Sequence, residues 1–171
     1  MYTYFGGTLM CSLRSRQGTM TADERYVTEA IELAERAVEN GNTPFGSLLV
    51  LDDTVIRRTQ NTTITENDLA AHPEFKLARW AGRELEPADR ARTTMYTSTE
   101  PCPMCASAIH YAGLGQVVYS VAGETLAEIR GGGVIDVPCA EIIERGDGAT
   151  TVDGPVLESA GRTVHESFDP E

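Results

Sequence analysis

The clearest pattern along the chain is an alternation between short apolar runs and longer stretches in which apolar residues recur every three or four positions. Between residues 22 and 40, tyrosine, valine, isoleucine and alanine recur at helical spacing. Thr21 followed by Glu24 makes a capping box before this stretch, and Gly41 ends it. The pattern predicts an amphipathic helix.

Five runs have the length and composition of strands, and the first two are joined by a hairpin turn at Asp52 and Asp53. Helical patterns separate the later strands, and the last eleven residues of the patterned region form a tail or a helix. The alternation predicts an α/β layer sandwich with crossover connections, whose last two strands are parallel because the helical material between them gives the length that a crossover needs. The predicted strands are 45–53, 54–63, 92–100, 115–121 and 150–157, and the later helices are 73–85, 103–115, 123–133 and 138–146.

Residues 1–20 have no clear period and are interpreted as a leader, and residues 21–171 as a single domain. Met20 is then the natural start; an extra strand or arm is the alternative for the leader. The opening residues lack the basic start, apolar stretch and cleavage site of a signal peptide. No apolar run approaches the roughly 20 residues that span a bilayer. We therefore expect a cytoplasmic protein without a membrane partner.

The chain is acidic, with 26 acidic and 14 basic residues and a net charge of −12. This charge repels nucleic-acid phosphates, which makes a nucleic-acid partner less favourable. Lys76 stands alone among the lysines, and acidic, lysine-poor chains also suit a high-salt cytoplasm, so both interpretations stay open. Of four cysteines, Cys11 and Cys139 stand alone and are interpreted as inert thiols.

The remaining two cysteines belong to a pattern typical of a metal site. His72 is followed by Glu74, and thirty residues later Cys102 and Cys105 lie three apart, on one turn of a predicted helix. Prolines after His72 and Cys102 place both residues at helix starts, where the positive helix end favours a thiolate. One imidazole and two thiolates supply three ligands for one zinc ion.

Three ligands leave a coordination position for water, as in catalytic zinc sites. Zinc lowers the pKa of such a water to about 7, and Glu74 could then move protons between the resulting hydroxide and a substrate. The joint pattern His-x-Glu with Pro-Cys-x-x-Cys is the signature of zinc nucleobase deaminases. A structural zinc site or an accidental pairing of two short motifs is the alternative.

Through these motifs the chain resembles the cytidine deaminase superfamily, and most closely the branch of guanine deaminases and tRNA adenosine deaminases. The resemblance runs from about residue 22 to 157 and includes "NTPFGSLLV", Asn61, Asp68 and "TEPCPMCASAI". It implies a three-layer sandwich with a five-stranded mixed sheet flanked by helices. It also implies hydrolytic deamination, one zinc ion per chain and a homodimer.

The resemblance further implies which residues bind the substrate. Asn61 would hydrogen-bond the base, although a satisfied turn amide is the alternative. Phe45 would line the pocket, or simply pack in the core. Glu128 falls where an acidic residue contacts the purine in bacterial guanine deaminases, although a solvated helix glutamate is slightly favoured, and Glu124 is weaker still. The implied substrate-binding set is Asn61, Phe45, Pro44, Glu128 and Pro101.

Two further residues need interpretation. His165 is interpreted as a surface or capping histidine rather than a ligand. Pro73 departs from the family, because most relatives carry there a residue with a backbone N–H, which in cytosine-type relatives lies beside the pyrimidine carbonyl. We therefore expect that cytosine is not held in the usual way, or that Pro73 only stiffens the helix start.

The leading interpretation is a zinc-dependent deaminase of a free nucleobase or nucleoside, above all a purine such as guanine, that releases ammonia by attack of zinc-bound hydroxide. One alternative is a tRNA adenosine deaminase, which would need a basic stripe near the site. Another is a cytosine or cytidine deaminase. A catalytically idle zinc interaction module is the last.

Overall fold

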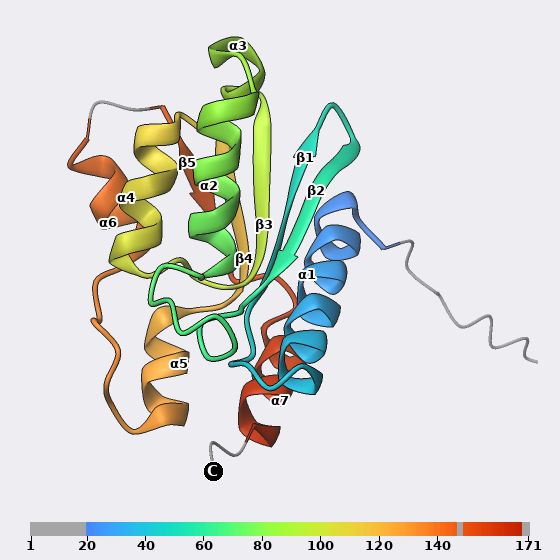
Figure 1. The fold of residues 1–171 in the computed structure, drawn as a ribbon, viewed down its shortest axis with the longest axis vertical. Helices are drawn as coiled ribbons and strands as arrows, with labels where there is room; N and C mark the ends of the chain where they lie inside the picture. Colours follow the sequence, from blue (N-terminus) through green and yellow to red (C-terminus); the bar gives the residue numbers. More distant parts are fainter. Residues whose placement is uncertain (1–19, 147–148, 169–171) are drawn as a thin grey trace, which may run out of the picture.

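The structure is a computed structural model that describes residues 20–146 and 149–168. The leader expected at residues 1–20 lies outside this part except for Met20. Five strands form one sheet between two layers of helices (Figure 1). The three-layer α/β sandwich with a mixed sheet is confirmed.

Helix α1 (Ala22–Glu39) begins at the predicted capping box. The Thr21 hydroxyl accepts a hydrogen bond from the Glu24 backbone N–H at 3.1 Å, and the Glu24 carboxylate accepts one from the Thr21 N–H at 2.7 Å. The apolar face of the helix packs against the sheet. Gly46 makes this packing close, because a Cβ there would lie 2.4 Å from the Leu33 Cβ.

The sheet has the order β2-β1-β3-β4-β5. The pairs β2–β1 and β1–β3 are antiparallel, whereas β3–β4 and β4–β5 are parallel, so the parallel pairing predicted for the last two strands is confirmed. The strands are β1 (Gly46–Leu51), β2 (Thr54–Gln60), β3 (Thr93–Thr99), β4 (Gln116–Val121) and β5 (Thr151–Asp153).

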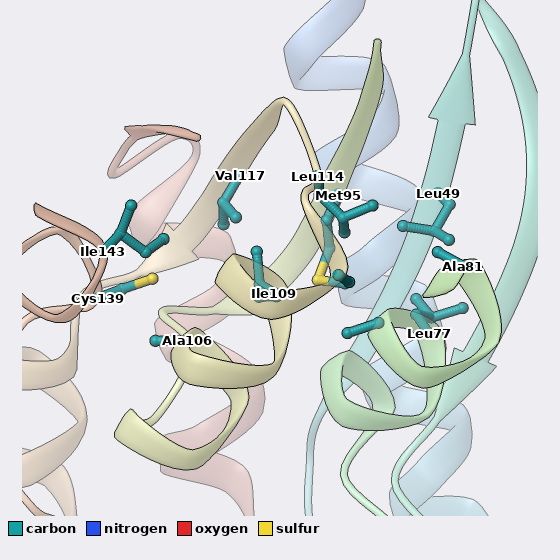
Figure 2. Close-up of a cluster of buried hydrophobic side chains, with 12 residues drawn as sticks. Leu49, Leu77, Ala81, Met95, Ala106, Ile109, Leu114, Val117, Cys139 and Ile143 are labelled. Carbon is teal, nitrogen blue, oxygen red and sulfur yellow. The ribbon is translucent and has the colours of Figure 1, made fainter. Parts of the chain in front are cut away.

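Helices cover both faces of the sheet. On one face lie α1 and α7 (Glu158–Ser167), which pack over the apolar side chains of the central strands. On the other lie α2 (Pro73–Glu84), α4 (Pro103–Ala112) and α6 (Cys139–Glu144). Figure 2 shows the core beneath this second layer, which includes Leu77, Ile109 and Ile143 from the helices and Leu49, Met95 and Val117 from the strands.

Strand β5 and helix α3 differ from the sequence prediction, and α7 decides between the two alternatives left open for the last segment. Strand β5 ends at Asp153 rather than residue 157, because Pro155 has no N–H to extend the ladder. The last segment is the helix α7. A one-turn helix, α3 (Pro87–Arg90), was not predicted because its four residues are too few to show a period. None of the helices in the described part is long and apolar enough to cross a membrane.

The topology brings the chemistry-bearing loops to one end of the sheet. Because β3 and β4 are parallel neighbours, their carboxyl ends lie together, and α4 and α5 (Gly123–Arg130) begin directly after them. Helix α2 packs beside α4, and both begin at this end (Figure 1). In open sheets of this kind, ligands bind at the carboxyl ends of the strands.

Candidate active site

The three predicted metal ligands come together at two helix starts. His72 is the N-cap of α2, Cys102 is the N-cap of α4, and Cys105 lies in the first turn of α4. The His72 Nδ1 lies 3.8 Å from the Cys102 Sγ and 3.6 Å from the Cys105 Sγ. All three ligand atoms lie within 4.8 Å of one another.

This arrangement fits zinc. Tetrahedral zinc with Zn–S of about 2.3 Å and Zn–N of about 2.0 Å separates the nitrogen and sulfur ligands by about 3.5 Å. Within residues 20–146 and 149–168, no fourth histidine, cysteine or acidic side chain joins the group. The fourth position is therefore not filled by a described ligand of these types, which is the pattern of a catalytic zinc site.

The surroundings shift the pKa values of the two thiols in opposite directions. The pKa of Cys102 falls to about 4, chiefly because Cys105 donates a hydrogen bond to it and secondly because His72 does so. The pKa of Cys105 rises because it is the donor and is buried.

Glu74 lies on the first turn of α2, buried with 4% of its surface exposed. Its Oε1 accepts hydrogen bonds from the Thr97 hydroxyl at 2.7 Å and the Ser47 hydroxyl at 2.9 Å. Ser47 on β1 and Thr97 on β3 are direct partners across the sheet. Burial raises the pKa of Glu74, and these two hydrogen bonds oppose the rise. Such a carboxyl group is fixed in place and suited to exchanging protons.

A cavity of about 890 Å³ opens beside these residues. One wall carries the metal ligands His72 and Cys102 with Glu74. The facing wall consists of α5 and the segment 133–138. Such a volume is near the upper end of the range of about 300–1,000 Å³ that is usual for small-molecule sites.

Phe45 lines this cavity and contacts three other side chains. Its ring is parallel to the His72 ring with 6.4 Å between centroids. The His165 ring lies 5.3 Å away, tilted by 58°, and the Arg130 Cζ lies 5.1 Å from the Phe45 centroid. The ring is half-buried at the wall of the cavity, so it is more than a core residue.

The two polar atoms of the Asn61 side chain differ in their hydrogen bonding. Its Oδ1 accepts hydrogen bonds from the Thr63 N–H at 2.9 Å and the Thr63 hydroxyl at 2.8 Å, which is the turn expected as the alternative. Its Nδ2 is buried and has no hydrogen-bond partner in the described structure. Its backbone N–H donates to the Phe45 carbonyl at 2.9 Å, which places Asn61 beside the cavity lining. Asn61 itself is not among the residues that line the cavity.

The remaining predicted substrate contacts are placed differently from one another. Pro101 lines the cavity, whereas Pro44 is buried and does not line it. Glu128 is exposed on α5 and lies outside the lining, and Glu124, the weaker candidate, lines it. The solvated position that was the alternative for Glu128 is the one that the structure has.

His165 was interpreted as a surface or capping histidine, and this is wrong. It is buried, with 5% exposed, and its Nε2 lies 2.8 Å from the Thr99 hydroxyl. Burial first, and the charge of Arg130 second, lower its pKa to about 4. The burial of His165 could have been predicted from its position directly after the apolar Val164, had the segment 158–168 been predicted as a helix rather than left open between a helix and a tail.

Sequence reasoning also missed Ser47, Thr97 and Arg130. The first two could have been suspected, because hydroxyl side chains at buried positions of a strand need partners. Arg130 gave no signal, because one arginine at a helix end is usually a favourable partner of the helix dipole.

Comparisons with known proteins identify the family. The model of the cytidine and deoxycytidylate deaminase zinc-binding region matches residues 20–121. This match covers all of the residues that form the metal centre, including Glu74.

Relatives with several substrates share this region. A tRNA-specific adenosine deaminase of Bacillus subtilis is 38% identical over 100 residues, which are 58% of this chain and 62% of the relative. A guanine deaminase of the same organism is 37% identical over 106 residues, 61% of this chain and 68% of the relative. A probable cytosine deaminase of Schizosaccharomyces pombe is 27% identical over 153 residues, 85% of this chain and 91% of the relative.

The fold is shared with a solved structure from a study of A-to-I editing by tRNA A34 deaminases at the wobble position. It superposes with a TM-score of 0.64 at 28% identity, covering 82% of this chain and 98% of that one. The family match, the three-ligand centre and this fold agree. The chain belongs to the cytidine and deoxycytidylate deaminase family of zinc-dependent hydrolytic deaminases.

Proposed function

We propose that the chain deaminates a small molecule, a free nucleobase or nucleoside, and that the ring it acts on is a purine such as guanine. The observation that supports deamination most directly is the position of Glu74, a buried carboxyl group two residues from a metal ligand at the wall of a large cavity. In the reaction, water adds to the ring carbon that carries the amino group. The carbon–nitrogen bond then breaks, the carbon becomes a carbonyl, and ammonia leaves.

The residues of the centre divide this work. His72, Cys102 and Cys105 would hold zinc, which when bound acts as a Lewis acid that activates water. Glu74 takes a proton from the water and passes it to the leaving nitrogen, because its carboxyl group is the buried acid beside the ligands. Thr97 and Ser47 hold the carboxylate toward the cavity from the sheet side.

The purine is supported by what the pocket offers to a ring. The Asn61 Nδ2 has no hydrogen-bond partner in the described residues, but it lies behind the cavity lining and would reach a ring nitrogen or carbonyl only after a local rearrangement. Pro73 occupies the first turn of α2 without a backbone N–H. A buried pyrimidine carbonyl left without that donor would cost about 1–3 kcal/mol. Replacing Pro73 by alanine should therefore improve cytosine relative to guanine, and unchanged preferences would contradict this role.

A tRNA substrate is the second candidate, because a relative at 38% identity carries that activity in its name. The charges on the surface make binding of a tRNA unfavourable. Among the described arginines, Arg58 and Arg92 pair with carboxylates, and Arg57 lies over the Trp80 ring. The charge of −12 also opposes binding to phosphates. The expected homodimer and cytoplasmic location stay predictions, of which light scattering can check the first.

The test is a substrate panel with the zinc-loaded protein. Ammonia release is measured with guanine, guanosine, adenosine, cytosine, cytidine and a tRNA anticodon stem-loop, at low and high salt, with zinc quantified in the same sample. We expect the highest kcat/KM with guanine or guanosine. Turnover confined to the stem-loop would replace the proposal by the tRNA activity, and no turnover of any substrate would support the idle zinc module.

A further inference from the structure

A buried histidine on the last helix lies behind the cavity, outside the groups that carry out the reaction. His165 belongs to α7, is buried and does not line the cavity. Burying an imidazole is unfavourable unless polar or aromatic groups replace the water that it loses. The partners of His165 are a residue of the cavity wall and a residue of the strand that leads to the metal ligands. These contacts indicate more than a space-filling role.

One partner of His165 is Thr99, the buried last residue of β3. The His165 Nε2 lies 2.8 Å from the Thr99 hydroxyl, and two residues separate Thr99 from the metal ligand Cys102. Burial first, and the charge of Arg130 second, lower the pKa of His165 to about 4, so the ring is neutral at neutral pH. A neutral imidazole has one donor and one acceptor nitrogen, and a hydroxyl group can pair with either. The hydrogen bond thus fixes the ring at the end of the strand.

The other partner of His165 is Phe45, the aromatic residue that lines the cavity. The two ring centroids lie 5.3 Å apart and the ring planes are tilted by 58°, which is a favourable arrangement for an aromatic pair. The Phe45 ring also lies parallel to the ring of the metal ligand His72, with 6.4 Å between centroids. Phe45 therefore contacts both histidines, and the orientation of His165 affects the cavity wall.

The backbone that carries His165 is fixed on two sides. Near the start of α7, the Glu158 Oε1 accepts a hydrogen bond from the Thr125 hydroxyl at 2.8 Å, which connects the helix to α5. Gly161 packs closely on β4, because a Cβ there would lie 2.6 Å from the Ser120 Oγ. Helix α7 also packs beside α1 (Figure 1). The fold thus holds the His165 side chain in a defined place beside its two partners.

We propose that His165 is a positioning residue for the deamination reaction, which through Thr99 and Phe45 holds the Phe45 ring in the orientation that the substrate meets. That the substrate contacts Phe45 rests on the proposed function, whereas the placing of the ring by His165 does not. Glu74 is held separately, by two hydroxyl groups of the sheet. Loss of the support from His165 should therefore weaken substrate binding more than it slows the chemical step.

The Phe45 ring can be observed without turnover. para-Fluorophenylalanine is placed at position 45 of the zinc-loaded protein and followed by fluorine NMR. Thr99→Val removes the hydroxyl group but keeps the shape of the side chain and leaves both rings in place, so we expect the signal to shift and broaden. Thr99→Ser retains the hydroxyl group and should keep the signal close to that of the parent. In a His165→Phe background, Thr99→Val should cause no further change, because the connection is already lost.

Steady-state kinetics with the best substrate of the panel measures the effect on the reaction. His165→Phe keeps an aromatic ring beside Phe45 but loses the hydrogen bond, whereas His165→Gln keeps a polar partner for Thr99 but loses the ring. We expect each variant to raise KM about three- to tenfold, the range of one hydrogen bond or one aromatic pair, and to change kcat less than about twofold. The zinc content should equal that of the parent, because the metal ligands are unchanged.

The matched control is Val164→Ala, at the residue before His165 on the same helix. Val164 is buried and packs with the apolar residues of α1 and the sheet. Its truncation should lower the thermal stability, as the His165 variants do, while KM and the fluorine signal stay as in the parent. If Val164→Ala raised KM as much as the His165 variants, His165 would be only a core residue and the positioning role would be wrong.

Further outcomes separate this inference from the proposed function. A fluorine signal that responds to Thr99→Val and His165→Phe, in a protein that deaminates none of the panel, would support the positioning role and contradict the proposed activity. Deamination of guanine with the parental KM in both His165 variants, with an unchanged signal in Thr99→Val, would do the reverse. If the His165 variants do not fold, Thr99→Val and Thr99→Ser decide. A signal and a KM that differ between these two support the positioning role, and equal values overturn it.

Discussion

The wall of the cavity that carries His72, Glu74 and Cys102 differs from the facing wall in how its backbone is held. The first is built on α2 and α4, which pack on each other and on the central strands, and Glu74 is further fixed by two hydroxyl groups. The facing wall is the short helix α5 and a segment, residues 133–136, whose four peptide N–H groups donate no hydrogen bond to a described protein atom. The metal ligands and Glu74 are thus fixed by the core, whereas the segment after α5 in the facing wall has fewer contacts with it.

The largest effect should come from breaking the first wall at a metal ligand. We expect Cys105→Ser to remove nearly all bound zinc and all activity, because a buried hydroxyl is a poor replacement for a thiolate ligand. Metal analysis and ammonia release measure this. Full zinc occupancy in the folded variant would contradict the three-ligand centre.

Next in size is the loss of the acid on the same wall. Glu74→Gln should retain zinc and lower kcat by about 10²- to 10⁴-fold, the usual contribution of general acid–base catalysis. Metal analysis together with ammonia release distinguishes this variant, which keeps zinc, from Cys105→Ser, which loses it. An active Glu74→Gln enzyme would show that another group moves the protons.

Glu100 connects the two walls, so its substitution sharpens the comparison. Glu100→Gln replaces one acceptor oxygen by a donor that faces a backbone N–H, and should destabilise the fold by about 2 kcal/mol, or roughly 4–8 °C in Tm. KM should rise more than kcat falls, because the helix starts on the substrate side are released. If kcat and the zinc content fell by the same factor, Glu100 would support the metal centre as much as the facing wall.

A smaller effect concerns pH. His165 has a pKa of about 4 in the folded chain and about 6.5 when unfolded, so the unfolded state alone gains a proton as pH falls from 7 to 5. This histidine then costs about 2 kcal/mol of stability at pH 5 relative to pH 7. In His165→Gln, the decrease in Tm between these pH values should be smaller than in the parent. An identical decrease would place the titration elsewhere.

The smallest effect should be at Glu128. Because its side chain is exposed and outside the cavity lining, Glu128→Ala should change kcat/KM by less than about twofold, within the range of surface substitutions. Glu124→Ala, on the lining, should change it more. Steady-state kinetics with the best substrate decides between them, and the opposite order would restore the assignment made from the resemblance.

The sequence was most informative where local chemistry and periodicity agree. The helix at 22–40, the hairpin at Asp52 and Asp53 and the helix starts at His72 and Cys102 each carry a capping, turn or proline signal, and the structure has them there. The metal centre could be predicted because its ligands belong to two short motifs, and only the contact between these two motifs is long-range.

The rest depends on tertiary contacts that leave no periodic trace. Ser47 and Thr97 become partners only through the pairing of β1 with β3, which are separated by 41 residues of chain. His165 approaches Phe45 only because α7 packs beside α1, and the sequence left α7 undecided between helix and tail. The strand β5 was predicted too long because the apolar residues after Pro155 have the composition of a strand although the strand ends at Asp153.

The single carboxylate of Glu100 has a consequence for how such a fold can change over generations. Since it fastens the first residues of both α5 and α6, the chain between these two anchors can gain, lose or exchange amino acids while the anchored ends stay where they are. Mutation can therefore explore new specificities on this stretch at little risk to the inherited reaction.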